Sequence, residues 1–256
     1  MFHLAAFSGA KTDSTANEAV PRVADGALSV SGSNNYLSPD NLSIFAALVY
    51  NDTIARARIV APSLRNEGLP EIFPLNATAE PSADFRYSYW DKMGPMLRKD
   101  EEFGVETSNG ASTVDNCTAL LWLRRVFKPT PNGKRFSIRA TSAQTLVANA
   151  WTLGGLTFDQ TLPFGRYSVI GMAATCNDAH AVRILFPRDQ SYRPGVGCGE
   201  TIAIRPITDY FRAGEQGEWG RFESVNAPQL EILGGTAGAE TAAVILDLVR
   251  LDSGVE

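Results

Sequence analysis

The stretch NDTIARARIVAP runs from Asn51 to Pro62, and a second stretch, NDAHAVRILFP, runs from Asn177 to Pro187. Both begin with Asn-Asp, place an alanine after two further residues, and end with Arg-Ile, two residues and a proline. The two copies are separated by about half of the 256-residue chain. Because an Asn-Asp pair between apolar runs is a turn signal, the repeat predicts the same hairpin in each half of the chain.

Further landmarks recur in the same order in both halves. They are LSIFAALVY before Asn51 with YSVIGMAATC before Asn177, EIFPL (71–75) with AIRPI (203–207), DFR (84–86) with DYFR (209–212), YWDKM (89–93) with EWGRF (218–222), and TALLWLRR (118–125) with AAVILDLVR (242–250). Short apolar and turn-rich strings resemble one another in any β protein. The shared order favours an internal duplication over that alternative.

A connector separates the two sets of landmarks. FKPTPNGK (127–134) contains two prolines and an Asn-Gly pair, which cannot continue a strand or a helix. We therefore predict two domains, residues 1–127 and 128–256.

The apolar runs on both sides of the connector are short and often alternate with polar residues, which is typical of β-strands. Turn signals such as PDN, PNG, PFG and RPG separate them. We predict an all-β fold of two tandem jelly-roll β-sandwiches, with short helices in loops at 88–104 and near ITDYFRAGEQ (207–216). An immunoglobulin-type sandwich competes, but its Cys-Trp-Cys core spacing is absent.

Composition limits the function classes. Hydrophobic residues make up 44% and charged residues 20% of the chain, which is typical of a globular protein. The apolar runs are shorter than the roughly 18 to 20 residues of a membrane-spanning helix. The opening lacks a basic segment before its apolar stretch, which predicts synthesis in a cytoplasm. A net charge of −5 without a basic run argues against sequence-specific nucleic-acid binding.

The residues that usually carry catalysis are scarce. A cupin metal site or a serine triad needs histidines, and the chain has only His3 and His180, the second of which we interpret as a hairpin side chain. We therefore predict no catalytic, cofactor-binding or metal-binding residue, and no enzyme. The cysteines are predicted to be free, buried thiols: Cys117, Cys176 and Cys198.

Other motifs have structural readings beside functional ones. GVGCGE (195–200) lacks the Lys-Ser or Lys-Thr of a phosphate-binding loop and reads as a flexible loop with a bystander thiol. The run 100–102, Asp-Glu-Glu, reads as a solvated face, with calcium binding as the alternative. The pairs Asp84 with Trp90 and Asp209 with Trp219 read as structural features kept in both copies.

These repeats, the connector and the scarcity of catalytic residues together resemble the double jelly-roll major capsid proteins of tailless icosahedral viruses, the lineage of internal-membrane bacteriophages and the adenovirus hexon. The resemblance is architectural and spans nearly the whole chain. It implies a homotrimer whose six barrels form a pseudo-hexagonal tile, with tiles packed side by side in a virion. Neighbouring trimers, minor capsid or penton proteins and an internal membrane are the implied partners. An N-terminal arm, Met1 to Asp25, is expected to reach neighbours or that membrane.

Two other readings remain open. One is a tandem β-sandwich that binds glycans or a receptor, as in spikes or fibres; the other is an enzyme on a bicupin or glycosidase scaffold. Assembly separates the first from the capsid reading, because a tile forms trimers and shells whereas a binding module stays a soluble monomer.

Overall fold

The computed structural model describes residues 2–11, 16–50, 54–65, 68–72, 88–90, 94–109, 115–198 and 210–251. It divides the chain into two compact units: an N-terminal unit, Leu4–Arg125, and a C-terminal unit, Val126–Glu256 together with Met1–His3. The division after Arg125 lies two residues before the predicted end of the first domain at 127. Unlike the predicted domains, the C-terminal unit also includes the first residues of the chain.

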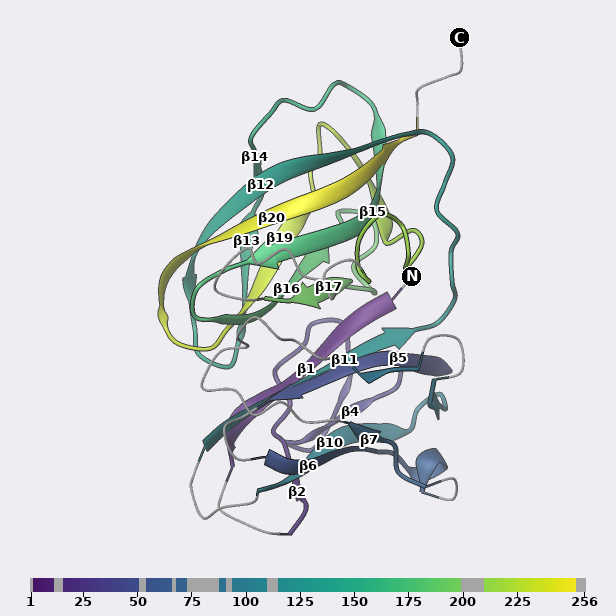
Figure 1. Cartoon of the computed structure of the whole chain (residues 1–256), viewed down its shortest axis with the longest axis vertical. Coiled ribbons are helices and arrows are strands. Elements are labelled where there is room, and N and C mark those ends of the chain that lie inside the picture. The colour runs from purple at the N-terminus through teal and green to yellow at the C-terminus, as the bar shows by residue number, and fades with distance from the viewer. Residues whose placement is uncertain are drawn as a thin grey trace. The chain divides into compact units, whose positions relative to one another are not determined.

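The N-terminal unit contains two sheets (Figure 1). The first has the order β1 (Phe2–Lys11), β11 (Asp115–Arg124), β5 (Leu42–Tyr50) and β8 (Ser88–Tyr89), and β9 (Met96–Leu97) also pairs with β5. The second has the order β3 (Val30–Ser31), β4 (Asn35–Leu37), β10 (Glu102–Asn109), β6 (Ile54–Val60) and β7 (Glu71–Ile72), and β2 (Glu18–Ala19) also pairs with β10.

The C-terminal unit also contains two sheets. The first has the order β14 (Thr157–Phe158), β12 (Lys134–Leu146), β20 (Gly238–Arg250), β15 (Arg166–Thr175) and β18 (Gly220–Glu223). The second has the order β13 (Trp151–Gly155), β19 (Gln229–Gly234), β16 (Ala179–Leu185) and β17 (Gly195–Gly197). The long β12–β20 pair is in register from Lys134–Arg250 to Leu146–Gly238.

The strand orders of the two units correspond. In each unit the first long strand lies beside the last one, as β1 beside β11 and β12 beside β20. The last strand also pairs with the strand that precedes the Asn-Asp landmark, β5 or β15. The strand that follows the landmark, β6 or β16, lies in the second sheet beside the penultimate long strand, β10 or β19.

This arrangement corrects the predicted hairpin. Asn177 and Asp178 join β15 in one sheet to β16 in the other, so the chain changes sheets at a corner and does not return along the same sheet. Asp178 has a φ of 53°, and its carbonyl accepts hydrogen bonds from the amides of Gly235 and Thr236. β16 is buried along its whole length, and β15 is buried from Tyr167 to Met172. In the N-terminal unit, 51–53 lie outside the described residues.

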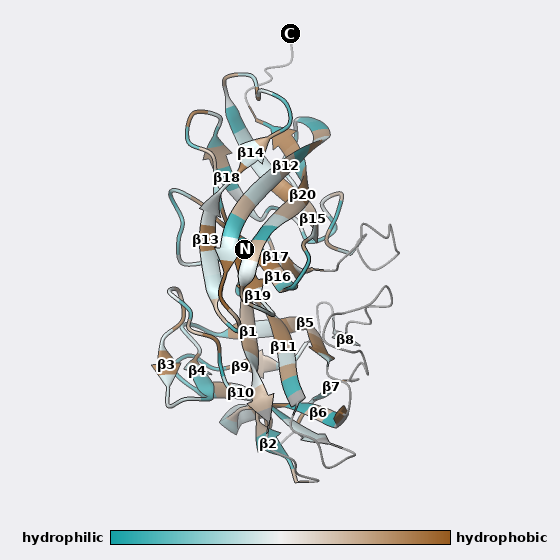
Figure 2. Cartoon of the chain, turned by 90° about the vertical axis from the view of Figure 1, so that its left-hand side faces the viewer, coloured by the Kyte–Doolittle hydropathy of each residue, from teal (hydrophilic) through white to brown (hydrophobic). Residues whose placement is uncertain are grey.

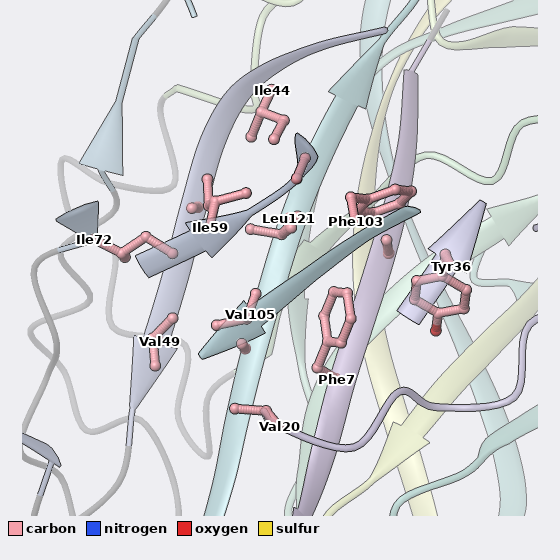
Figure 3. Packing of buried hydrophobic residues seen from close by; sticks show 14 of the residues in the cluster. Phe7, Val20, Tyr36, Ile44, Val49, Ile59, Ile72, Phe103, Val105 and Leu121 are labelled. Atoms are coloured by element: carbon pink, nitrogen blue, oxygen red, sulfur yellow. The ribbon is translucent and has the colours of Figure 1, made fainter. Parts of the chain in front are cut away.

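A single hydrophobic core joins the two sheets of the N-terminal unit (Figure 3). Phe7, Val49 and Leu121 from the first sheet share it with Ile59 and Val105 from the second. Alternate residues of a strand point to opposite faces, and along β11 every second residue from Cys117 to Leu123 belongs to this core. Burying such side chains contributes roughly 1.5 to 3 kcal/mol each, which makes this core the main stabilising contact of the unit.

Buried and less buried positions also alternate along a strand of the C-terminal unit. Along β20, Ala242, Val244 and Leu246 are fully buried and alternate with half-buried Ala243 and Ile245, and from Leu246 to Val249 every residue is buried. Figure 2 shows the corresponding mixture of apolar and polar positions along the strands. The all-β prediction is therefore confirmed.

The predicted helices are wrong where the structure describes them. Within 88–104 lie β8, β9 and the start of β10. The backbone of Gly94 lies against β5, where a Cβ would come within 2.0 Å of the Ile44 carbonyl oxygen, and the Pro95 carbonyl accepts the amide of Ile44. Because these groups bond to a sheet edge, they cannot form a helix. Among the described residues the one helical segment is a short 3-10 turn, Pro62–Leu64.

The second expected helix is a series of turns over 210–216, since Ala213 and Gly214 have φ values of 54° and 88°. Left-handed backbone at two successive positions ends any helix. Residues 207–209 lie outside the described part. No helix in the described residues has the length and apolarity to cross a bilayer.

The expected N-terminal arm is also wrong in its first part. Residues 2–11 form β1, and Phe2 is buried beside Phe211 and Trp219 of the C-terminal unit. The prediction of an arm did not take the large apolar side chains of Phe2, Leu4 and Phe7 into account. Their burial explains why this segment is a strand.

Candidate interaction surface

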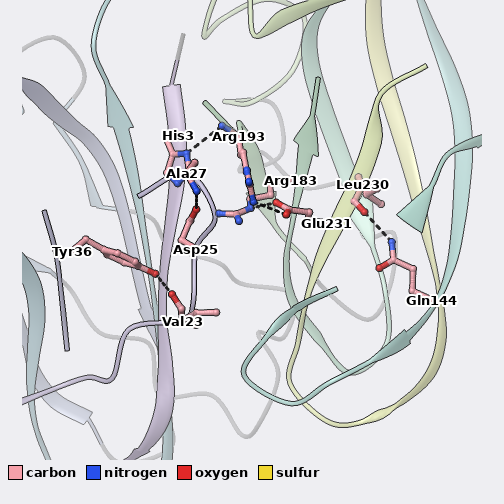
Figure 4. Close-up of polar contacts among 10 residues, drawn as sticks. All are labelled: His3, Val23, Asp25, Ala27, Tyr36, Gln144, Arg183, Arg193, Leu230 and Glu231. Atoms are coloured by element: carbon pink, nitrogen blue, oxygen red, sulfur yellow. Dashed lines mark hydrogen bonds and ion pairs between the residues drawn. The ribbon is translucent and has the colours of Figure 1, made fainter. Parts of the chain in front are cut away.

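The two histidines lie in packed positions. His3 is buried, and its Nδ1 accepts a hydrogen bond of 3.2 Å from the amide of Arg193 (Figure 4). His180 is buried in β16, where desolvation lowers its pKa from 6.5 to about 4. A histidine with this pKa is neutral near pH 7. In the described residues no three His, Cys, Asp or Glu side chains are grouped as metal ligands.

The acidic run at 100–102 organises loops of the N-terminal unit. Asp100 has a φ of 62°. The carboxylate of Glu101 accepts hydrogen bonds from the amide and hydroxyl of Ser63, at 3.0 and 2.7 Å, and from the amide of Arg98. Glu102 accepts one from the side-chain amide of Asn35. Within the run that was expected to be a solvated face, the carboxylates of Glu101 and Glu102 therefore have specific hydrogen-bond partners.

The glycine-rich stretch 195–200 begins as strand β17, in place of the expected flexible loop. A Cβ on Gly195 would lie 2.2 Å from the carbonyl oxygen of Val182, so glycine allows β17 to approach β16 closely. Cys198 is buried, as are Cys117 and Cys176, and all three are free thiols. Residues 199 and 200 lie outside the described part.

The repeated tryptophans occupy corresponding places. The amide of Trp90, next to β8, donates to the carbonyl of Phe45 in β5, and the amide of Trp219, next to β18, donates to Val169 in β15. Their aspartate companions at 84 and 209 lie outside the described residues, as do the landmarks at 73–75 and 203–207.

Two buried ion networks stabilise the C-terminal unit. The Glu231 carboxylate binds Arg183 Nε at 2.5 Å and Arg193 Nη1 at 2.6 Å (Figure 4). The Arg183 guanidinium lies over the Trp151 ring, 3.9 Å from its centroid. Because both carboxylate oxygens are bonded, the buried charge of Glu231 is compensated.

The second network surrounds Asp247. Burial alone would raise the pKa of this carboxyl, but hydrogen bonds from Arg212, the Ala213 amide and the Ser137 hydroxyl outweigh it and lower the pKa below its usual value. Asp247 therefore stays charged, and it fixes the turn at 212–213 onto β20.

An exposed apolar tip is the first candidate contact surface of this unit. Phe164 is 82% exposed and Val225 is 71% exposed. They flank Gly165 and Ser224, which exchange two hydrogen bonds: Gly165 N to Ser224 Oγ at 3.2 Å, and Ser224 N to Gly165 O at 3.0 Å. We call Phe164 and Val225 the apolar tip.

The loop of the apolar tip is held firmly. The Tyr167 hydroxyl donates to the Pro163 carbonyl at 2.7 Å, and Arg250 Nη2 donates to the Phe164 carbonyl at 3.1 Å. Since the backbone on both sides of Phe164 is bonded to neighbouring strands, the aromatic ring is presented on a rigid support.

A hollow of about 700 Å³ in the same unit is the second candidate. Its lining residues come from the connector, from the turn after β16 and from around β18: Lys128, Pro129, Thr130, Pro131, Asn132, Arg188, Asp189, Glu218, Gly220 and Arg221. We call it the connector hollow. A smaller hollow of about 100 Å³ shares Arg188 and Arg221 with it.

The walls of the connector hollow are fixed by backbone contacts. The amide of Glu218 donates to the Lys128 carbonyl at 2.8 Å, and Thr130 Oγ1 donates to the Gly214 carbonyl at 3.0 Å. Glu218 accepts the guanidinium of Arg221 through both carboxylate oxygens. Sequence reasoning noted the connector and the PFG turn only as breaks between strands, because exposure of a turn residue has no periodic signal.

Comparison with known proteins adds little. No protein-family model matches the chain, and no curated protein matches it in sequence. Among the solved structures that match is the crystal structure of the major capsid protein from bacteriophage PM2, which is 12% identical with a TM-score of 0.23 over 100% of both chains. A TM-score this low establishes neither a shared fold nor a shared function.

Proposed function

We propose that the chain is a major capsid protein in which both units are jelly rolls, and in which three copies form a pseudo-hexagonal tile of a virus shell. The observation that carries the proposal is the common strand order of the two units. In each unit, consecutive strands on either side of the Asn-Asp landmark belong to different sheets, and the first and last long strands are neighbours. A jelly roll interleaves two sheets in this way, so the strand order supports the proposal.

Assembly physics favours a tile for such a chain. Two similar units in one chain, repeated around a three-fold axis, supply six similar edges from a single gene product. Each unit has an extensive apolar core of its own, so each can act as a rigid block. Rigid blocks suit a shell, because contacts between them lose little conformational freedom on assembly.

The contacts of three polar side chains fit a structural role. His3, Glu101 and Asp247 each bond to backbone or side-chain groups that fix loops and strands. Under this proposal the protein is made in a host cytoplasm and resides in the virion.

Electron microscopy and light scattering of the purified chain test the proposal. We expect trimers and, at higher concentration, sheets or closed shells with pseudo-hexagonal units. A chain that remains monomeric under all conditions and binds glycans on an array would contradict the tile and favour the tandem binding module. A structure of the particles would in addition show whether the two units superpose.

A further inference from the structure

We propose that the apolar tip of one copy inserts into the connector hollow of a neighbouring copy, which makes this pair a head-to-tail contact of the assembly. The inference rests on the proposed function and adds to it a specific pair of surfaces. Both surfaces belong to the C-terminal unit, so every copy carries one of each.

The tip has the properties of an anchor. An aromatic side chain that is 82% exposed leaves a large apolar area in water, and Val225 enlarges it. Isolated exposed apolar residues are common, but here two of them flank one hydrogen-bonded pair, Gly165 and Ser224. Because the loop is already ordered, binding through Phe164 would cost little additional entropy.

The hollow has the chemistry to receive an aromatic ring. Pro129 and Pro131 line one part of it with rigid apolar surface, and Arg188 and Arg221 line another. A guanidinium is attracted electrostatically to the face of an aromatic ring. The hollow's volume of about 700 Å³ lies within the range of pockets that hold small molecules, which is room enough for one aromatic ring.

The occupant is a second copy, because the ring and the arginines that would bind it are both present on this chain. Phe164 cannot fill the hollow of its own copy, since most of its surface is exposed. A surface that binds a different surface of an identical copy forms rings when the rotation closes. The contact area of one tip is small, so we expect it to hold only when several contacts close together.

Cysteine cross-linking tests the pairing directly, because the native thiols are all buried and do not compete. Val225→Cys places a thiol on the tip and keeps the Phe164 ring, and Asn132→Cys places a thiol at the exposed rim of the hollow. We expect cross-linked dimers when the two variants are mixed and oxidised under assembly conditions, and none from either variant alone. Cross-linking of Val225→Cys with itself would indicate a tip-to-tip contact and overturn the inference.

A substitution test complements the cross-link. We expect Phe164→Ser to reduce assembled particles at least tenfold, and Arg188→Ala to weaken assembly in the same direction. The control is Val147→Ser, which removes another exposed apolar side chain, 56% exposed, of the same unit. It should assemble like the unmodified chain.

The remaining outcomes separate this inference from the proposed function. If the unmodified chain assembles and Phe164→Ser assembles equally well, the tip-in-hollow contact is wrong while the capsid proposal stands. If the unmodified chain never assembles, both are wrong. If Phe164→Ser assembles normally but loses binding to vesicles containing anionic lipid, the tip is a membrane contact, which also overturns the inference.

Discussion

The ring of Phe2 meets the ring of Trp219 edge-on, with centroids 4.9 Å apart, so the second residue of the chain packs into the C-terminal unit. Truncating a buried phenylalanine to alanine costs about 3 to 5 kcal/mol. We therefore expect Phe2→Ala to lower the free energy of unfolding of the C-terminal unit by about that amount, measured by urea denaturation followed by circular dichroism.

A matched control exists in the same unit. Phe164→Ala makes the same chemical change at an exposed position and should alter the stability of the isolated copy by less than about 0.5 kcal/mol. Equal effects of the two substitutions would show that Phe2 is not buried in solution.

Burial of His180 predicts a dependence of stability on pH. Its pKa is about 4 in the folded chain, below the ordinary histidine value of 6.5, so between these two pH values the unfolded chain binds a proton that the folded chain does not. Above pH 6.5 the ionisation of His180 does not reduce the free energy of unfolding. As the pH falls below 6.5 the free energy of unfolding decreases, by about 3 kcal/mol at pH 4. Denaturation midpoints measured from pH 4 to 7 follow this loss.

The variant His180→Gln isolates that contribution, because glutamine does not titrate. The difference in unfolding free energy between the two proteins should vary with pH over this window, whereas the contributions of carboxyl groups common to both cancel. A difference that is constant from pH 4 to 7 would mean that His180 has an ordinary pKa.

The charge of Glu231 is expected to contribute more to the stability of the fold than the charge of an exposed acid. Glu231→Gln leaves the guanidinium of Arg183, which is fully buried, with a weakened partner and should cost about 3 to 5 kcal/mol. Glu71→Gln disrupts the exposed pair with Arg56 and should cost no more than about 1 kcal/mol. Thermal unfolding of both variants compares these costs, and a similar small loss from each would argue against the buried network.

Close packing of β17 on β16 predicts a contrast between two glycines. Gly195→Ala should cost about 1 to 3 kcal/mol and increase amide exchange in 195–197, because its Cβ would collide with β16. Gly155→Ala, on β13, meets no atom within 4 Å and should be close to neutral. Hydrogen exchange with mass spectrometry reports both. Unchanged exchange at β17 in the first variant would contradict the close approach.

Some features could be predicted from the sequence because they repeat. The alternating pattern of AAVILDLVR indicates a strand, and it lies within β20. The Asn-Asp stretch also marks corresponding places in the two units. Its nature as a corner between sheets, however, depends on which strands pair across the chain, and a local pattern does not encode that pairing.

The surface features were missed for a different reason. Phe164 lies in a Pro-Phe-Gly turn that marks a loop, yet nothing in those letters distinguishes an exposed aromatic from one folded back onto the core. Similarly, Met1 to Asp25 contains many small and polar residues, which favoured an arm, whereas the few large side chains at Phe2, Leu4 and Phe7 decide its fold. Composition averages over a segment, but burial is decided by single positions.

The membership of Met1–His3 in the C-terminal unit has a consequence for biosynthesis. Phe2 leaves the ribosome long before Phe211 and Trp219 are translated, so the hydrophobic cluster of these three rings closes only after Trp219 has been made. Residues that are made early thus complete a unit whose other residues are made later. A bulky tag fused ahead of Phe2 would hinder this late closure, whereas one fused after Glu256 would leave it undisturbed.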